Sequence, residues 1–128
     1  MARPTWFSTF RAFLWPWLLV GWTVFVWAGR IRLAEGEVGP FLLALTFLVP
    51  AVALAVAIVR FRAAVPALVG ALALWTTGVW VVRDADIVLG GDHPVGFVVV
   101  HVVLGVVSVA LAALALRSVL RRPEVVAV

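Results

Sequence analysis

The amino-acid sequence predicts an all-α integral membrane protein, folded as one antiparallel four-helix bundle. Three observations lead to this fold class: the composition is strongly apolar, the apolar residues fall in four long runs, and short charged segments separate the runs. Of the 128 residues, 66% are hydrophobic and 12% are charged, and the mean hydropathy is +1.21. A soluble domain is roughly half apolar and about a quarter charged. A soluble chain this short could not bury so much apolar surface, so we expect lipid to be its solvent.

Each of the four apolar runs is long enough to cross a bilayer as one helix. The runs span residues 12–29, 38–59, 63–82 and 95–117. None contains a charged residue before its last position, and a hydrocarbon core about 30 Å thick needs about 20 helical residues. The valines at 98–100 and 102–103 do not alternate with polar residues, as they would in a β-barrel strand. We therefore predict a single transmembrane domain over residues 1–128, whose short connections make consecutive helices antiparallel.

The arginines predict how this bundle is oriented in the membrane. Seven lie on the side of the two termini: Arg3, Arg11, Arg60, Arg62, Arg117, Arg121 and Arg122. Three lie on the opposite side: Arg30, Arg32 and Arg83. The side richer in arginine is expected to face the cytoplasm. We therefore expect a multi-pass protein of the plasma (inner) membrane, N-in and C-in, with residues 30–37 and 83–94 outside.

Two tryptophans mark the expected membrane interface on that outer side. Trp27 and Trp80 fall near the ends of the first and third runs, at the depth where indole rings commonly meet the lipid headgroups. The first run carries four tryptophans in all and is longer than a typical signal-peptide core. We therefore expect it to be a retained membrane anchor.

The composition also excludes several function classes. All ten basic residues are arginine, but they separate apolar runs instead of forming one basic patch, so we predict no nucleic-acid binding. The chain has no cysteine, and its two histidines, His93 and His101, lie near the start of the fourth run. Thiolate sites and a haem held by histidines of two helices are therefore not expected. We find no Ser-His-Asp constellation and no glycine-rich phosphate motif, and we expect no enzyme activity, no cofactor and no metal.

Small and polar residues predict one packing face on each of the last two helices. On the fourth, spacings of four, three and four residues place four side chains on one face: His101, Gly105, Ser108 and Ala112. On the third, a roughly matching face carries Gly70, Ala73, Thr77 and Asp84. Small residues on such faces allow helices to approach closely in a membrane. We predict that the two faces meet and that His101 points towards Asp84 or Thr77.

Arg83, Asp84 and His101 form the candidate polar cluster of this chain. Ionisable residues within a membrane are costly, and for that reason they are functional candidates. Two interpretations stay open: a structural clasp that fixes the register of two helices, or a proton-handling or ligand site, since histidine titrates near neutral pH. Asp86 and Asp92 match no strong metal motif and are expected in a solvated turn.

One stretch of sequence carries a family resemblance. It is Trp80-x-x-Arg83-Asp84, followed by Asp92-His93-Pro94-x-Gly96-Phe97 and then by His101. With this stretch and its composition, the chain resembles the small uncharacterised four-helix membrane proteins of GC-rich actinobacteria. The resemblance covers the whole chain and implies no established activity.

The function predicted from these residues is that of a non-catalytic accessory or scaffolding subunit of a larger membrane complex. The runs hold almost no polar residues, no catalytic constellation is present, and the helix faces suit association. The expected partners are the lipid bilayer and other membrane protein subunits, or a second copy of the chain. The alternative is a small oligomeric transporter or channel that uses His101 and Asp84. Polarity confined to one end gives such a pathway a poor lining.

Overall fold

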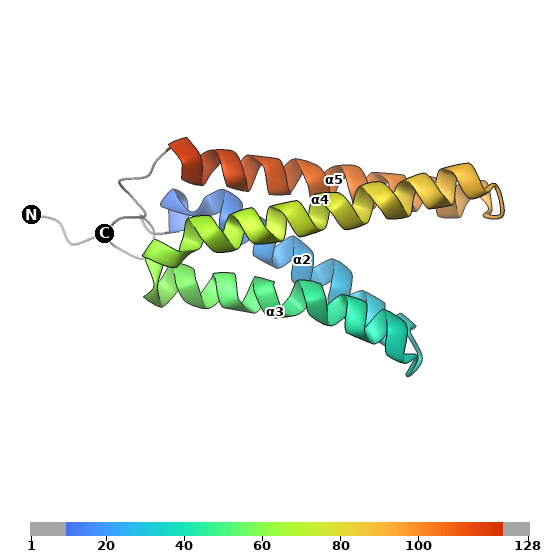
Figure 1. Cartoon of the computed structure of the whole chain (residues 1–128), viewed down its shortest axis with the longest axis horizontal. Helices are drawn as coiled ribbons and strands as arrows, with labels where there is room; N and C mark the ends of the chain where they lie inside the picture. Colours follow the sequence, from blue (N-terminus) through green and yellow to red (C-terminus); the bar gives the residue numbers. More distant parts are fainter. Residues whose placement is uncertain (1–9, 122–128) are drawn as a thin grey trace, which may run out of the picture.

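The computed structural model describes residues 10–121, which form four long helices joined by short connections (Figure 1). The helices are α2 (Leu14–Leu33), α3 (Val38–Arg60), α4 (Val65–Gly90) and α5 (Val95–Arg121), and the 3-10 turn η1 (Arg62–Ala64) precedes α4. Each helix, α4 taken together with η1, is long and apolar enough to cross a membrane. The prediction of an all-helical chain with four apolar helices is therefore confirmed. Arg3 and Arg122, two of the arginines that predict the orientation, lie outside the described residues.

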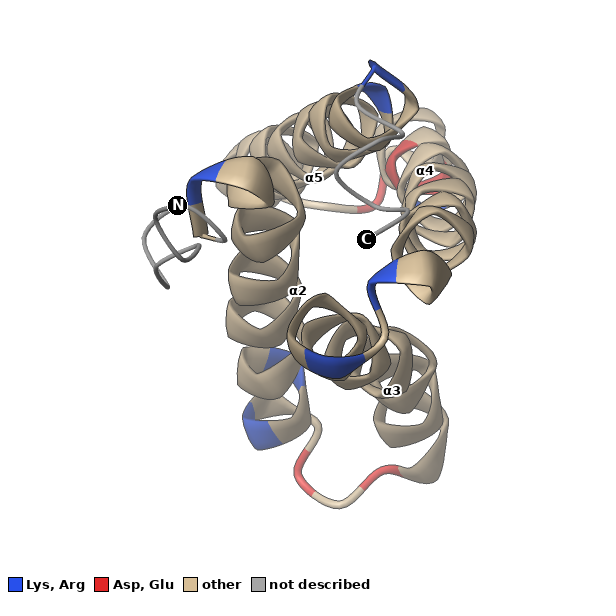
Figure 2. Cartoon of the chain, turned by 90° about the vertical axis from the view of Figure 1, so that its left-hand side faces the viewer, with Lys and Arg blue, Asp and Glu red and all other residues tan. Residues whose placement is uncertain are grey.

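The four helices are arranged as two hairpins. Consecutive helices run in opposite directions, and α2 packs mainly on α3 while α4 packs mainly on α5. The two hairpins lie close together at the end where α3 passes into α4, which we call the α3–α4 end. They diverge towards the opposite end, where α4 passes into α5 (Figure 1). We call this opposite end the α4–α5 end. Most charged residues lie near helix ends or in the connections, and Figure 2, which looks along the bundle, shows them in blue and red.

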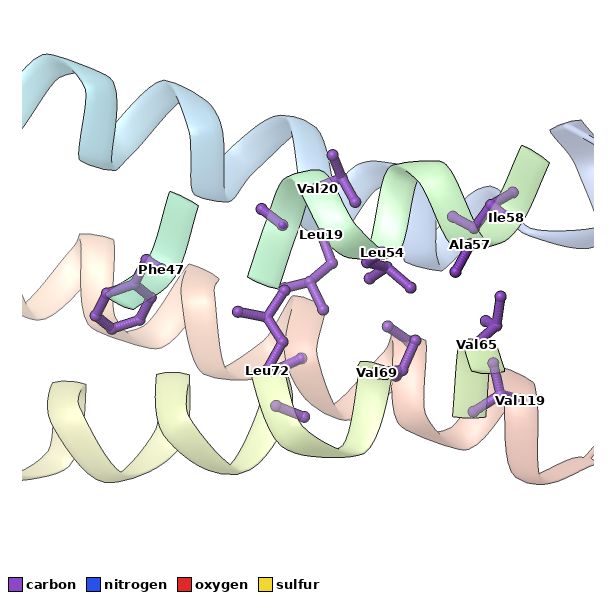
Figure 3. Close-up of a cluster of buried hydrophobic side chains, with 14 of the residues drawn as sticks. Leu19, Val20, Phe47, Leu54, Ala57, Ile58, Val65, Val69, Leu72 and Val119 are labelled. Carbon is purple, nitrogen blue, oxygen red and sulfur yellow. The ribbon is translucent and has the colours of Figure 1, made fainter. Parts of the chain in front are cut away.

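Apolar side chains fill the bundle between its middle and the α3–α4 end. Leu19 of α2, Leu54 and Ile58 of α3 and Val69 of α4 are fully buried there, and Val119 of α5 packs with them (Figure 3). Lipid tails are as apolar as these side chains, so removal from water does not hold the helices together. Close van der Waals contact does so instead, and it requires that the space be filled.

Three helices extend further than the apolar runs predict. α2 continues to Leu33 and α5 to Arg121, while α4 continues past residue 82 to Gly90. The predicted loop 83–94 is therefore wrong for most of its length, because only residues 91–94 connect α4 to α5. A charged residue ends an apolar run without ending a helix. α4 stops at Gly91, whose φ of 70° is the left-handed conformation that commonly closes a helix.

Candidate functional site

A pocket lies between the two hairpins at the α4–α5 end of the bundle. Its volume is about 610 Å³, and all four helices and the α2–α3 connection contribute to its lining. The polar side chains that line it are Arg30, Glu35, Glu37, Arg83 and His101. Apolar residues supply the remaining side chains, among them Trp27 and Leu104. Polar and apolar groups therefore meet in the space that the diverging hairpins leave between them.

Aromatic rings form a layer beside this pocket. The Trp27 ring of α2 stacks on Phe47 of α3, with centroids 4.0 Å apart, and it lies 6.0 Å from the Trp80 ring of α4. Only 2% of Trp27 and 1% of Trp80 are exposed. These two tryptophans therefore pack inside the bundle, where their rings link α2 to α4. The expectation that they lie at the depth of the membrane interface stays a prediction.

Two arginines enter the pocket from different helices. Arg30 lies three residues after Trp27 on α2, and Arg83 lies three residues after Trp80 on α4. Because α2 and α4 run in the same direction, each arginine lies about one helical turn nearer the α4–α5 end than the tryptophan of its own helix, and both arginines line the pocket. Arg30 also lies over the Trp27 ring, with its Cζ 5.9 Å from the ring centroid, in the geometry of a cation–π contact.

Neither arginine forms an ion pair among the described residues, although the charge of Arg83 also acts on the Asp84 carboxylate across a longer distance. No carboxylate lies within ion-pair distance of either, and their like charges repel each other. Arg30 Nη2 and Arg83 Nε are buried and make no hydrogen bond. Sequence reasoning used Arg30 only to predict the orientation and missed its place in the site. The repeated Trp-x-x-Arg spacing is the signal that would have found it.

His101 is buried at the same pocket, with only 7% of its surface exposed. Its Nδ1 lies 2.8 Å from the backbone oxygen of Phe97, one turn earlier on α5. A carbonyl oxygen can only accept, so Nδ1 carries a proton and donates it, and Nε2 is the ring nitrogen left for another partner. The Phe97 ring packs against His101 and against His93, with centroid distances of 3.9 Å and 4.6 Å.

Asp84 packs against the backbone of α5 and does not hydrogen-bond to His101. A Cβ placed on Gly105 would meet an Asp84 carboxylate oxygen, would lie 3.0 Å from Asp84 Cγ, and would lie 3.2 Å from the Trp80 ring. No hydrogen bond or ion pair joins Asp84 to His101 within residues 10–121, and their charges interact only across a longer distance. Asp84 Oδ1 is buried without a hydrogen-bond partner. The structure thus brings Arg83, Asp84 and His101 into one region but does not link them as a bonded clasp.

The packing residues on α5 and α4 behave differently. On α5, the buried residues include His101, Gly105, Ser108 and Ala112. Ser108 accepts a hydrogen bond from Trp22 Nε1 at 2.8 Å, which ties α5 to α2. On α4, Ala73 is buried, but Gly70 and Thr77 are only partly buried, and a Cβ added to Gly70 would meet nothing within 4 Å. Thr76 and Trp80 take the buried positions instead, so the face of α4 is rotated from the one predicted.

The acidic residues beyond the pocket form no metal site in the part of the chain that the structure describes. Asp86, Asp92 and His93 are all exposed. No three His, Asp or Glu side chains between residues 10 and 121 are placed to hold a metal ion. Asp86 is the last acidic residue of α4, while Asp92 and His93 lie in the connection to α5.

A second hollow lies on the outer surface of α4, and we call it the Gly78 groove. Its volume is about 600 Å³, and its lining residues are Trp75, Gly78, Val79, Val82, Arg83 and Asp86. The Trp75 side chain is half-exposed and donates a hydrogen bond from Nε1 to Thr46 Oγ1 of α3, at 2.9 Å. A Cβ added to Gly78 would meet nothing within 4 Å. The groove therefore runs past an open helix backbone between an indole ring and a pair of opposite charges.

Comparison with known proteins adds no functional assignment. No family model, curated protein or solved structure matches this chain.

Proposed function

We propose that this chain is a non-catalytic accessory or scaffolding subunit of a larger membrane complex, and that a transmembrane helix of a partner protein packs in the Gly78 groove. The observation that supports this proposal is the open glycine backbone on the outer surface of α4. In the proposed arrangement the chain crosses the plasma membrane four times with both termini in the cytoplasm. The α4–α5 end then lies outside.

The outward-facing Gly78 lowers the stability of its helix, and packing inside this chain does not offset that loss. Glycine lowers helix stability by about 1 kcal/mol relative to alanine, and Gly78 makes no close side-chain contact in the described chain. Small residues are enriched where two membrane helices meet, because they let the backbones approach. Trp75 and Val82 form the walls of such a contact. Asp86 at one end of the groove offers a negative charge to the end of a partner helix.

The packing of the core argues against transport through one copy of the chain. An aqueous pathway needs polar lining across the whole bilayer. Here the half of the bundle nearest the α3–α4 end is filled by fully buried apolar residues such as Leu19, Leu54 and Val69. His101 is buried against its own helix, and Asp84 packs on Gly105. The transporter or channel alternative therefore gains no support from these two residues.

A photo-crosslinking experiment in the native host tests the proposed partner site. A photoreactive amino acid is placed at Val82, which lines the groove, or at Phe25, which lies on α2 and does not line it. The two positions are a matched pair because 71% of Val82 and 70% of Phe25 are exposed. We expect a crosslink to another membrane protein from position 82 and not from position 25. Gly78→Leu, which fills the groove, should abolish it.

Three results would contradict this proposal. Equal crosslinking from positions 25 and 82 would mean that the partner does not use the groove. A crosslink that survives Gly78→Leu would lead to the same conclusion. A product at twice the mass of the chain, with no other protein attached, would identify a second copy as the occupant and would rule out the accessory role.

A further inference from the structure

We infer that the pocket between the hairpins is a phosphate-binding site, in which Arg30 and Arg83 hold the phosphate group of a phospholipid headgroup or a free phosphate ion. This inference goes beyond the accessory role and does not depend on it. It rests on three features of the pocket: two arginines that form no ion pair among the described residues, a histidine with one ring nitrogen free, and an apolar lining.

The arginine pair supplies the charge that a phosphate requires. Two guanidinium groups from separate helices line one pocket, repel each other and have no carboxylate within ion-pair distance among the described residues. An anion between them would offset this repulsion. It would also give hydrogen-bond acceptors to guanidinium nitrogens such as Arg30 Nη2 and Arg83 Nε, which are buried without partners. The planar guanidinium group is suited to bind phosphate through two parallel hydrogen bonds.

His101 adds a third group to the same pocket. Its Nδ1 is already engaged with the Phe97 carbonyl, which fixes the ring on α5. Nε2 is then the ring nitrogen available to a ligand. The sequence-based cluster of Arg83 and His101 thereby becomes part of a ligand site that also includes Arg30.

The remaining lining favours a phospholipid as the source of the phosphate. Leu33, Leu43 and Leu104 line the pocket with apolar surface, which suits the glycerol and acyl portion of a lipid. Glu35 and Glu37, both from the α2–α3 connection, also line it and are exposed. Their charges repel a phosphate ion that approaches from water, but they attract an ammonium group carried on the same headgroup. Phosphatidylethanolamine combines these chemical groups.

Native mass spectrometry of the full-length chain, released from detergent micelles, tests this inference. The probes are phosphatidylethanolamine and a diacylglycerol with the same acyl chains, which lacks the phosphate. The wild-type chain should bind one phosphatidylethanolamine at least roughly tenfold more tightly than diacylglycerol, because charge-assisted hydrogen bonds are the strong ones. Arg30→Gln and Arg83→Gln should each weaken that binding by roughly tenfold to a hundredfold. Arg32→Gln is the matched control, because Arg32 is exposed on the same helix and does not line the pocket.

Titration with inorganic phosphate distinguishes the two sources. A free phosphate is the ligand if three results are found together. Phosphate raises the unfolding temperature of the wild-type chain, it does not do so in either pocket variant, and the wild-type chain binds the two lipids equally. Equal binding of the two lipids together with no effect of phosphate would overturn the inference. If Arg32→Gln weakened phosphatidylethanolamine binding as much as the pocket variants do, the inference would also be overturned, since the overall charge of the chain would then explain the binding. If the pocket variants do not fold, the inference is still tested by comparing how tightly the wild-type chain binds phosphatidylethanolamine and diacylglycerol.

Discussion

Gly105 is the residue at which the contact between α4 and α5 depends on the absence of a side chain. Among the ten glycines of the chain, it is the one whose added Cβ would meet other atoms, namely the Asp84 carboxylate and the Trp80 ring. The carboxylate of a membrane helix is costly to bury, and Asp84 occupies the space that Gly105 leaves open. A methyl group at position 105 would have to displace it.

We therefore predict that Gly105→Ala lowers the free energy of unfolding by about 1–3 kcal/mol relative to Gly96→Ala, the usual cost of overpacking. Gly96 is the matched control, because it lies on the same helix and an added Cβ there would meet nothing within 4 Å. Reversible unfolding in mixed micelles measures both variants. Asp84→Ala combined with Gly105→Ala should recover part of the loss. If Gly105→Ala and Gly96→Ala unfold alike, the described contact is absent.

At the scale of single residues, periodicity predicted the α5 face better than the α4 face. His101, Gly105, Ser108 and Ala112 recur at helical spacing and are buried. On α4, Thr76 and Thr77 are adjacent and chemically identical, so composition could not show which of the two is buried. Periodicity also could not show that Arg30 and Arg83 line the same pocket, because this depends on how α2 and α4 are placed across the bundle.

At the scale of elements, the end of a helix was harder to predict than the number of helices, and α4 shows why. The thickness of the hydrocarbon core sets the length of an apolar run, so the four runs predicted four helices. The thickness does not set where hydrogen bonding along the backbone stops. Residues 83–90 continue α4 beyond its apolar run, and in this segment charge was wrongly taken as the sign of a loop. The left-handed Gly91 is the local feature that ends it.

We predict that Gly91→Ala destabilises the last turn of α4, whereas Gly90→Ala does not. Gly91 has a φ of 70°, and a non-glycine residue in this conformation costs about 1–2 kcal/mol. Gly90 is helical, and an added Cβ there would meet nothing within 4 Å. Hydrogen exchange of the amides at residues 86–90 is the measurement, and it should accelerate in Gly91→Ala alone. Equal exchange in the two variants would show that the left-handed glycine does not determine where α4 ends.

At the scale of the whole molecule, two hairpins share a filled core at one end and enclose a pocket at the other. In lipid the helices are held by close packing and by a few hydrogen bonds, such as that from Trp22 to Ser108. Leu19 and Leu54 are fully buried where the hairpins meet, and the pocket of about 610 Å³ lies where they diverge. The sequence predicted the number and direction of the helices. It could not predict the divergence, because this depends on how side chains from different helices, such as Trp27 and Trp80, pack across the bundle.

The central claim is that the chain crosses the membrane four times and places the α4–α5 end, with its pocket, outside. Thiol labelling of whole cells tests it most directly, because the chain contains no cysteine. Asp92 and Arg60 are both exposed and lie at opposite ends of the bundle, so each accepts a single cysteine. With an impermeant maleimide, Asp92→Cys should react in intact cells, and Arg60→Cys should react only after the membrane is opened. The reverse pattern would contradict the orientation, and reaction of both variants in intact cells would contradict the four crossings.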